Sequence, residues 1–302
     1  MSGKIYLPNI STELTGDPNN AANKYGDQTG QDLYNSARGA HVVPGLDFKL
    51  KHAIDQIYND YGDVVTIKPK SLAKFGSNLL VGTSYATLMT LPAGVTDETY
   101  ISTNGITHIS SSDAGDTQAV KIEGHTISGS DLTFVVQSTT LDGQNKVALT
   151  TPLARVTRVY NDDSTDFAGS IYVYEDDTVS AGVPTTNSKV HLIVPIGENQ
   201  SFKGATAVSS VDYWLLTGIV ASVNEKTAAT VDIELQIRSL GKVFRTQFNF
   251  TIASTGSNTV ELDLDPVIIV PKNSDVRMRA KASTNNVSVS GRMKGYLALI
   301  SS

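Results

Sequence analysis

An alternation of apolar and polar residues between positions 231 and 252 constrains the fold more than any other feature of the sequence. The apolar positions of its two runs are Val231, Ile233, Leu235 and Ile237, then Phe244, Phe248, Phe250 and Ile252. The runs are separated by the turn-forming stretch of residues 239–242. Because successive side chains of a strand point to opposite faces, the pattern predicts an antiparallel hairpin with one face in a core and the other in water.

Short runs of this kind recur from about Val64 to the C-terminus, separated by turn formers such as Asn104-Gly105 and Asp142-Gly143. Charged residues make up only 18% of the chain, which fits many short strands joined by turns. The single Trp, Trp214, opens a long β-rich run, and we expect it in a core. We therefore predict an all-β chain with two β domains. A small antiparallel domain is expected over residues 63–151, and a jelly-roll-like β-sandwich over residues 152–302.

The first 62 residues follow different patterns. Residues 1–45 are rich in Asn, Gly, Asp and Gln, which predicts an extended arm that becomes ordered on a partner. Over residues 46–62, apolar side chains that include Leu50, Ile54 and Ile57 recur at helical spacing. The stripe has two interpretations. It packs on its own β domain, or Leu50, Ile54 and Ile57 form the subunit contacts of a homotrimer.

The net charge of the chain and the absence of Cys limit the kinds of partner that we expect. The formal net charge is -6, so we expect neither nucleic acid nor an anionic membrane as a partner. There is no Cys to form disulfides or thiolate metal sites, and no apolar run approaches the length of a membrane span. These features predict protein partners, including further copies of the chain.

Sequence motifs for catalysis are missing. There is no Cys nucleophile, no Gly-x-Ser-x-Gly elbow and no phosphate-binding glycine motif, and the five His are scattered without metal-ligand spacing. Acidic clusters at residues 162–166 and 175–177 allow two interpretations, turn formation or calcium binding. We favour turns, and predict a chain that is not an enzyme and has no catalytic residue, cofactor or metal.

The most distinctive charged feature is a set of three cations at alternate positions, Arg277, Arg279 and Lys281. This spacing places them on one face of a predicted strand. They are interpreted either as a solvated, edge-protecting strand face or as a patch that docks on an acidic neighbouring subunit.

Five segments carry a resemblance to a known class of proteins. They are residues 124–134 (GHTISGSDLTF), 147–161 (VALTTPLARVTRVYN), 170–174 (SIYVY), 189–200 (KVHLIVPIGENQ) and 268–277 (IIVPKNSDVR). They resemble segments of virion structural proteins of tailed bacteriophages, of the type found in phages of marine and aquatic bacteria. The resemblance implies a component of the virion. Because the sequence has no apolar run of signal-peptide length near its start, we expect synthesis in the cytoplasm of the host.

Within that class we expect a capsid decoration or cement subunit that binds the major capsid protein, or other virion proteins, and stabilises the assembled shell. The alternative is a tail or vertex adaptor, knob or short fibre that contacts the host surface. A third class, a polysaccharide-degrading appendage, would require an acidic cleft.

Overall fold

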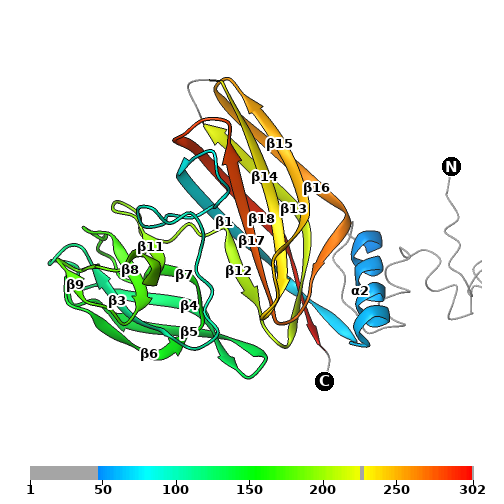
Figure 1. The fold of residues 1–302 in the computed structure, drawn as a ribbon. Helices are drawn as coiled ribbons and strands as arrows, with labels where there is room; N and C mark the ends of the chain where they lie inside the picture. Colours follow the sequence, from blue (N-terminus) through cyan, green and yellow to red (C-terminus); the bar gives the residue numbers. More distant parts are fainter. Residues whose placement is uncertain (1–46, 225–227, 301–302) are drawn as a thin grey trace, which may run out of the picture.

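The structure is a computed structural model that describes residues 47–224 and 228–300. In this part of the chain there is one α-helix, α2 (Asp47–Tyr61), and almost all other regular structure is antiparallel β-sheet (Figure 1). The fold is therefore all-β, as predicted. The predicted arm of residues 1–45 lies outside the described residues.

Two sheets pack face to face in the larger domain, which Figure 1 shows on the right. Sheet I contains, in hydrogen-bonding order, β1 (Val65–Val81), β18 (Val287–Ile300), β13 (Asp212–Asn224) and β16 (Ser257–Val270). Sheet II contains β12 (Ala205–Val208), β17 (Ser274–Ala282), β14 (Ala229–Ser239) and β15 (Arg245–Ser254), and the short β2 (Ala86–Thr87) also pairs with β17. Apolar side chains, including the fully buried Trp214, fill the space between the two sheets.

The pairing of these strands is nested. Leaving out the short β2, the first strand of the domain pairs with the last (β1 with β18), β12 pairs with β17, β13 with β16, and β14 with β15. This is the connectivity of one long antiparallel ribbon, bent at the β14–β15 turn and rolled into two sheets, and it defines a jelly roll. The predicted hairpin is its centre, because Ile233 pairs with Phe250 and Leu235 with Phe248.

A second β domain is inserted between β2 and β12, and we call residues 106–194 the inserted domain. One of its sheets contains β11 (Val190–Val194), β8 (Ile171–Glu175), β3 (Ile106–Ser111) and β6 (Val147–Leu153). The other contains β5 (Asp131–Thr140), β4 (Ala119–Ser128) and β7 (Arg155–Asn161). The ribbon β9 (Val179–Ser180) with β10 (Val183–Pro184) and a 3-10 turn, η2 (Asn187–Lys189), complete it around a separate apolar core.

The strand pairing divides the chain differently from the predicted boundary between residues 151 and 152. That boundary falls inside β6, and β7, β8 and β11 all pair within the inserted domain. At the other end, β1 belongs to the jelly roll because it pairs with β18. Each of these assignments depends on a partner strand that is distant in sequence, so local patterns do not reveal them.

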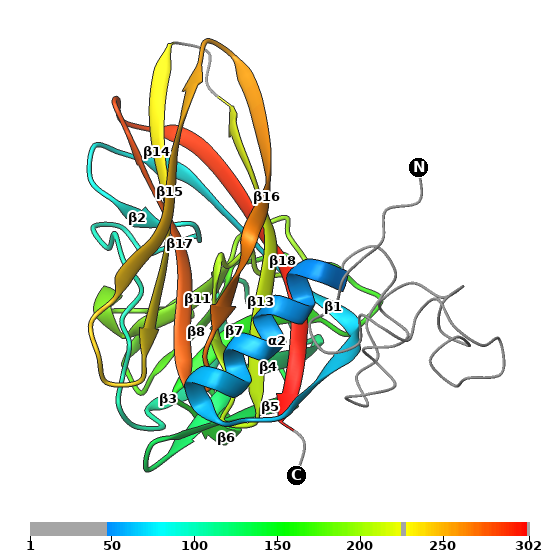
Figure 2. The same cartoon turned by 90° about the vertical axis from the view of Figure 1, so that its right-hand side faces the viewer.

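Helix α2 lies inside the predicted range of residues 46–62 and packs on the outer face of sheet I (Figure 2). Leu50 and Ile57 are fully buried and Ile54 is nearly so, against side chains such as Tyr213 and Leu215 of β13. The stripe is therefore part of the subunit's own core. The expectation that Leu50, Ile54 and Ile57 form subunit contacts is corrected, because sheet I already covers them. No helix in the described part of the chain is long and apolar enough to span a membrane.

Candidate functional site

The cationic side chains of β17 lie on one face of the strand, as predicted, but that face is covered. Arg277 Nε donates to Gln236 Oε1 at 2.9 Å, and Arg277 Nη1 lies 3.5 Å from Asp97 Oδ1. Arg279 Nε lies 3.3 Å from the same Asp97 oxygen, and Arg279 Nη1 lies 3.5 Å from Glu234 Oε1. Two of the three cations are therefore neutralised within the subunit.

Lys281, the third cation, remains partly exposed and lies 3.4 Å from Asp232 Oδ2. The expectation of a docking patch at Arg277, Arg279 and Lys281 is corrected for the two arginines. Their face of sheet II also carries Asp97, from the segment that leads from β2 to the inserted domain, and Phe244, from the turn between β14 and β15. On this face Glu234 and Gln236, which occupy polar positions of the predicted hairpin, are each only 8% exposed.

Guanidinium groups and aromatic rings alternate where the inserted domain meets the jelly roll. Tyr100 lies between Arg155, at 5.0 Å from its ring centroid, and Arg238, at 4.2 Å. Phe244 lies against Tyr100 at 5.1 Å and against Arg277 at 4.0 Å. The stack joins the inserted domain (Arg155), a linker (Tyr100) and the jelly roll, and cation–π attraction is stronger where water is excluded.

Asp275 anchors this stack. Its carboxylate is fully buried and accepts two hydrogen bonds from Arg155, from Nε at 2.8 Å and from Nη2 at 3.1 Å. A third comes from Arg238 Nε at 2.9 Å. A two-point guanidinium–carboxylate contact fixes orientation as well as distance, so the Arg155–Asp275 pair holds the two domains in one relative position. We call these residues, with Tyr100 and Phe244, the locked junction.

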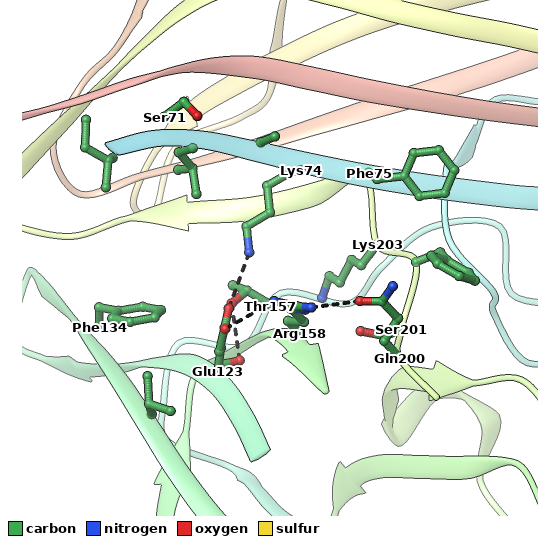
Figure 3. Close-up of a pocket in the computed structure, with 15 residues that line it drawn as sticks. Ser71, Lys74, Phe75, Glu123, Phe134, Thr157, Arg158, Gln200, Ser201 and Lys203 are labelled. Carbon is green, nitrogen blue, oxygen red and sulfur yellow. Dashed lines mark hydrogen bonds and ion pairs between the residues drawn. The ribbon is translucent and has the colours of Figure 1, made fainter. Parts of the chain in front are cut away.

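An open groove lies beside the locked junction, with a volume of about 640 Å³ (Figure 3). One wall is β1 at residues 71–75, and the other is the face of the β5-β4-β7 sheet that points away from the core of the inserted domain. Side chains alternate along a strand, so five consecutive lining residues indicate that the free edge of β1 borders the groove. Three of its apolar members are unusually open: Phe75, Phe134 and Val136 are 44%, 48% and 52% exposed.

The groove also holds a shared carboxylate. Glu123 lies 3.8 Å from Lys74 Nζ and 3.7 Å from Arg158 Nη1, and Arg158 Nη2 donates to Gln200 Oε1 at 2.8 Å (Figure 3). Burial lowers the pKa of Lys74 to about 8, although the Glu123 charge opposes this shift. Two cations sharing one carboxylate leave the centre of the groove positively charged when Lys74 is protonated. This groove is the candidate binding site.

His191 and members of both acidic clusters have polar partners within the subunit. His191 Nε2 lies 3.1 Å from Glu175 Oε1, and burial lowers the pKa of His125 to about 3. Asp166 Oδ1 accepts a hydrogen bond from Asn199, and Asp177 Oδ2 accepts one from a backbone N–H. Within residues 47–224 and 228–300, no three His, Cys, Asp or Glu side chains are grouped as a metal site would require. The choice between turn formation and calcium binding for the two acidic clusters stays a prediction.

The sequence did not reveal the junction or the groove. Arg155 and Asp275 are 120 positions apart, and no motif links them. The sequence around Phe134 and Val136 has the alternation of an ordinary strand. Only the position of β1 in the structure shows that the face carrying these two side chains borders an open groove.

No family model matches this chain, and no curated protein is similar to it in sequence. Among solved structures, the chain is similar to one from the naturally occurring empty top-component particles of cowpea mosaic virus, at 8% identity and a TM-score of 0.21 over 63% of this chain and 79% of that chain. It is also similar to one from the infectious bursal disease virus VP2 subviral particle, at 12% identity and a TM-score of 0.21 over 76% and 72%. Similarities this low carry no argument about function.

Proposed function

We propose that this chain is a structural protein of a tailed-phage particle, a decoration or cement subunit that binds the assembled shell and stabilises it. The observation that carries the proposal is the contrast between a jelly roll with a closed apolar interior and an open, partly apolar groove on its surface. The resemblance of five sequence segments to phage virion proteins supports the choice of particle.

The interior of the roll is lined mainly by apolar side chains. On β14 and β17 the inward positions are apolar, for example Val231, Ile233, Val276 and Ala280, apart from Ser274 at the start of β17, and the other buried polar side chains of these strands lie on the opposite face. Some jelly-roll families bind ligands inside the roll. In this chain the accessible features are on the surface, so we assign it a binding role and no catalytic one.

We further propose the groove as the attachment surface, with the major capsid protein as its occupant. The two half-exposed aromatic rings, Phe75 and Phe134, favour an apolar partner surface, and the surplus positive charge beside Glu123 favours an acidic side chain within it. A subunit that binds the assembled shell more tightly than the open shell stabilises the assembled shell by mass action. The contributions of many weakly bound copies add together.

The second candidate function is a tail or vertex adaptor, knob or short fibre. The arrangement of the two β domains beside each other, with the inserted domain projecting from the roll, also suits an appendage (Figure 1). A homotrimer remains a prediction under both functions, but its contacts must lie outside the buried stripe of α2.

The number of copies per particle separates the two functions. Shell decoration implies on the order of hundreds of copies and a tail component roughly 3 to 18, because each follows the symmetry of its site. A quantitative gel of purified particles measures this number. We expect the higher range, and a value in the lower range would move the assignment to the tail.

A further inference from the structure

The two linkers that connect the jelly roll with the inserted domain meet at one pair of side chains. Glu98 lies in the linker between β2 and β3, and Lys203 lies in the linker between β11 and β12. Lys203 Nζ contacts Glu98 Oε1, and each side chain is only 3% exposed. The pair thus connects the linker that enters the inserted domain with the linker that leaves it.

The two side chains of this pair differ in their hydrogen bonding: the ammonium group has a further partner, and one carboxylate oxygen has none. Lys203 Nζ donates to the carbonyl oxygen of Val156 at 2.6 Å, but Glu98 Oε2 is buried and has no hydrogen-bond partner. The space next to the pair, lined also by Tyr100 and Thr206, has no volume for a water molecule. A buried carboxylate oxygen without a donor is costly, and such an atom calls for an explanation.

We propose that Glu98 and Lys203 react to form an intramolecular amide, a covalent staple across the base of the inserted domain. One ammonium proton passes to the carboxylate across the existing contact, which leaves an amine and a carboxylic acid. Nζ then attacks Cδ of Glu98, a C–N bond forms, and the C–Oε2 bond breaks. In the tetrahedral intermediate Oε2 takes a second proton from Nζ, and it leaves as water together with the proton that Oε1 had received. No oxidant, reductant or other reactant is required.

The product removes the imbalance. The unpartnered Oε2 is the atom that leaves, and the one N–H that remains on Nζ can still donate to the Val156 carbonyl oxygen. Two features of the site favour the reaction. Burial lowers the pKa of Lys203, against the opposing charge of Glu98, which favours the reactive neutral amine. The two groups are also held in contact and away from water, which raises the effective concentration and slows hydrolysis of the amide.

The staple suits a chain without Cys, because it closes a long loop of chain with a bond that does not depend on a disulfide. Constraining such a loop lowers the entropy of the unfolded chain, as a disulfide does. The inference stands on the local geometry and does not rest on the proposed function.

The test is the intact mass of the denatured, purified full-length protein. We expect wild type to be lighter than its sequence by one water molecule, and protease digestion to give a branched peptide that joins Glu98 to Lys203. The Lys203→Met variant should have the full mass of its own sequence. In the matched control, Lys74→Met removes the other lysine that faces a glutamate at this interface, and the deficit of one water should remain.

A wild-type protein with its full sequence mass and only linear peptides would overturn the proposal and leave the pair a buried ion pair. A deficit that persists in Lys203→Met would also overturn it, because the lost water would then come from elsewhere. The wild-type measurement requires no variant to fold.

Discussion

The two parts of the interface between the inserted domain and the jelly roll are built in opposite ways. At the locked junction, Asp275 is fully buried and receives three guanidinium hydrogen bonds. In the neighbouring groove, Glu123 has its cations at 3.7 and 3.8 Å, and the rings of Phe75 and Phe134 are about half exposed. One half of the interface therefore fixes the two domains relative to each other, and the other half leaves apolar surface available.

The largest effect is expected from the locked junction. Arg155→Met removes the two-point contact and leaves the buried Asp275 with Arg238 alone. Removing one partner of a buried ion pair costs about 3–5 kcal/mol, so we expect a loss of that size in the free energy of unfolding, measured with denaturant. In the control, Lys281→Met removes an exposed pair and should cost at most about 1 kcal/mol. Equal losses would contradict the special role of the junction.

A somewhat smaller effect is expected at the helix. Leu50 is fully buried between α2 and sheet I, and Leu50→Ala should destabilise the fold by about 2–5 kcal/mol, depending on how far the site relaxes. Because this side chain faces its own subunit, the subunit number measured by light scattering should stay as in wild type. A change in subunit number at unchanged stability would instead restore the stripe as a subunit contact.

The pH dependence of stability tests the groove. The pKa of Lys74 is lowered from 10.5 to about 8 by burial, so between these values the unfolded chain binds more protons than the folded one. Below this window, burial of the charged Lys74 lowers the free energy of unfolding by a constant amount. As the pH rises through the window this penalty disappears, so stability increases by about 1–3 kcal/mol. Denaturant unfolding of Lys74→Met across the window should show a smaller rise than wild type. An identical pH profile would show that Lys74 is solvated.

The smallest effect on stability is expected from the apolar members of the groove. Phe134→Ser replaces a half-exposed ring and should change the free energy of unfolding by less than about 1 kcal/mol. The same change should weaken binding to particles that lack the protein, measured by co-sedimentation. Leu79→Ser, which removes an exposed side chain outside this groove, is the control and should bind as wild type. Equal weakening by both variants would remove the groove as the attachment surface.

Local features of the fold could be predicted from the sequence, and long-range ones could not. The β14–β15 hairpin followed from alternation, but the register that places Ile233 opposite Phe250 did not. The range of α2 followed from helical spacing, but the spacing did not say what covers Leu50. The sequence predicted Arg277 as an exposed cation, because its partner Asp97 is distant in sequence. The sites depend on such long-range pairs, which local periodicity does not encode.

Hydrogen exchange of the free and the particle-bound protein tests whether the groove is the attachment surface. We expect binding to slow exchange of backbone amides along the groove, at residues 71–75 and 134–136. Amides near the locked junction, at residues 155 and 275–277, should be slow in both states because the junction is already closed. Slowed exchange confined to another surface, with the groove unchanged, would show that the groove is not the attachment surface.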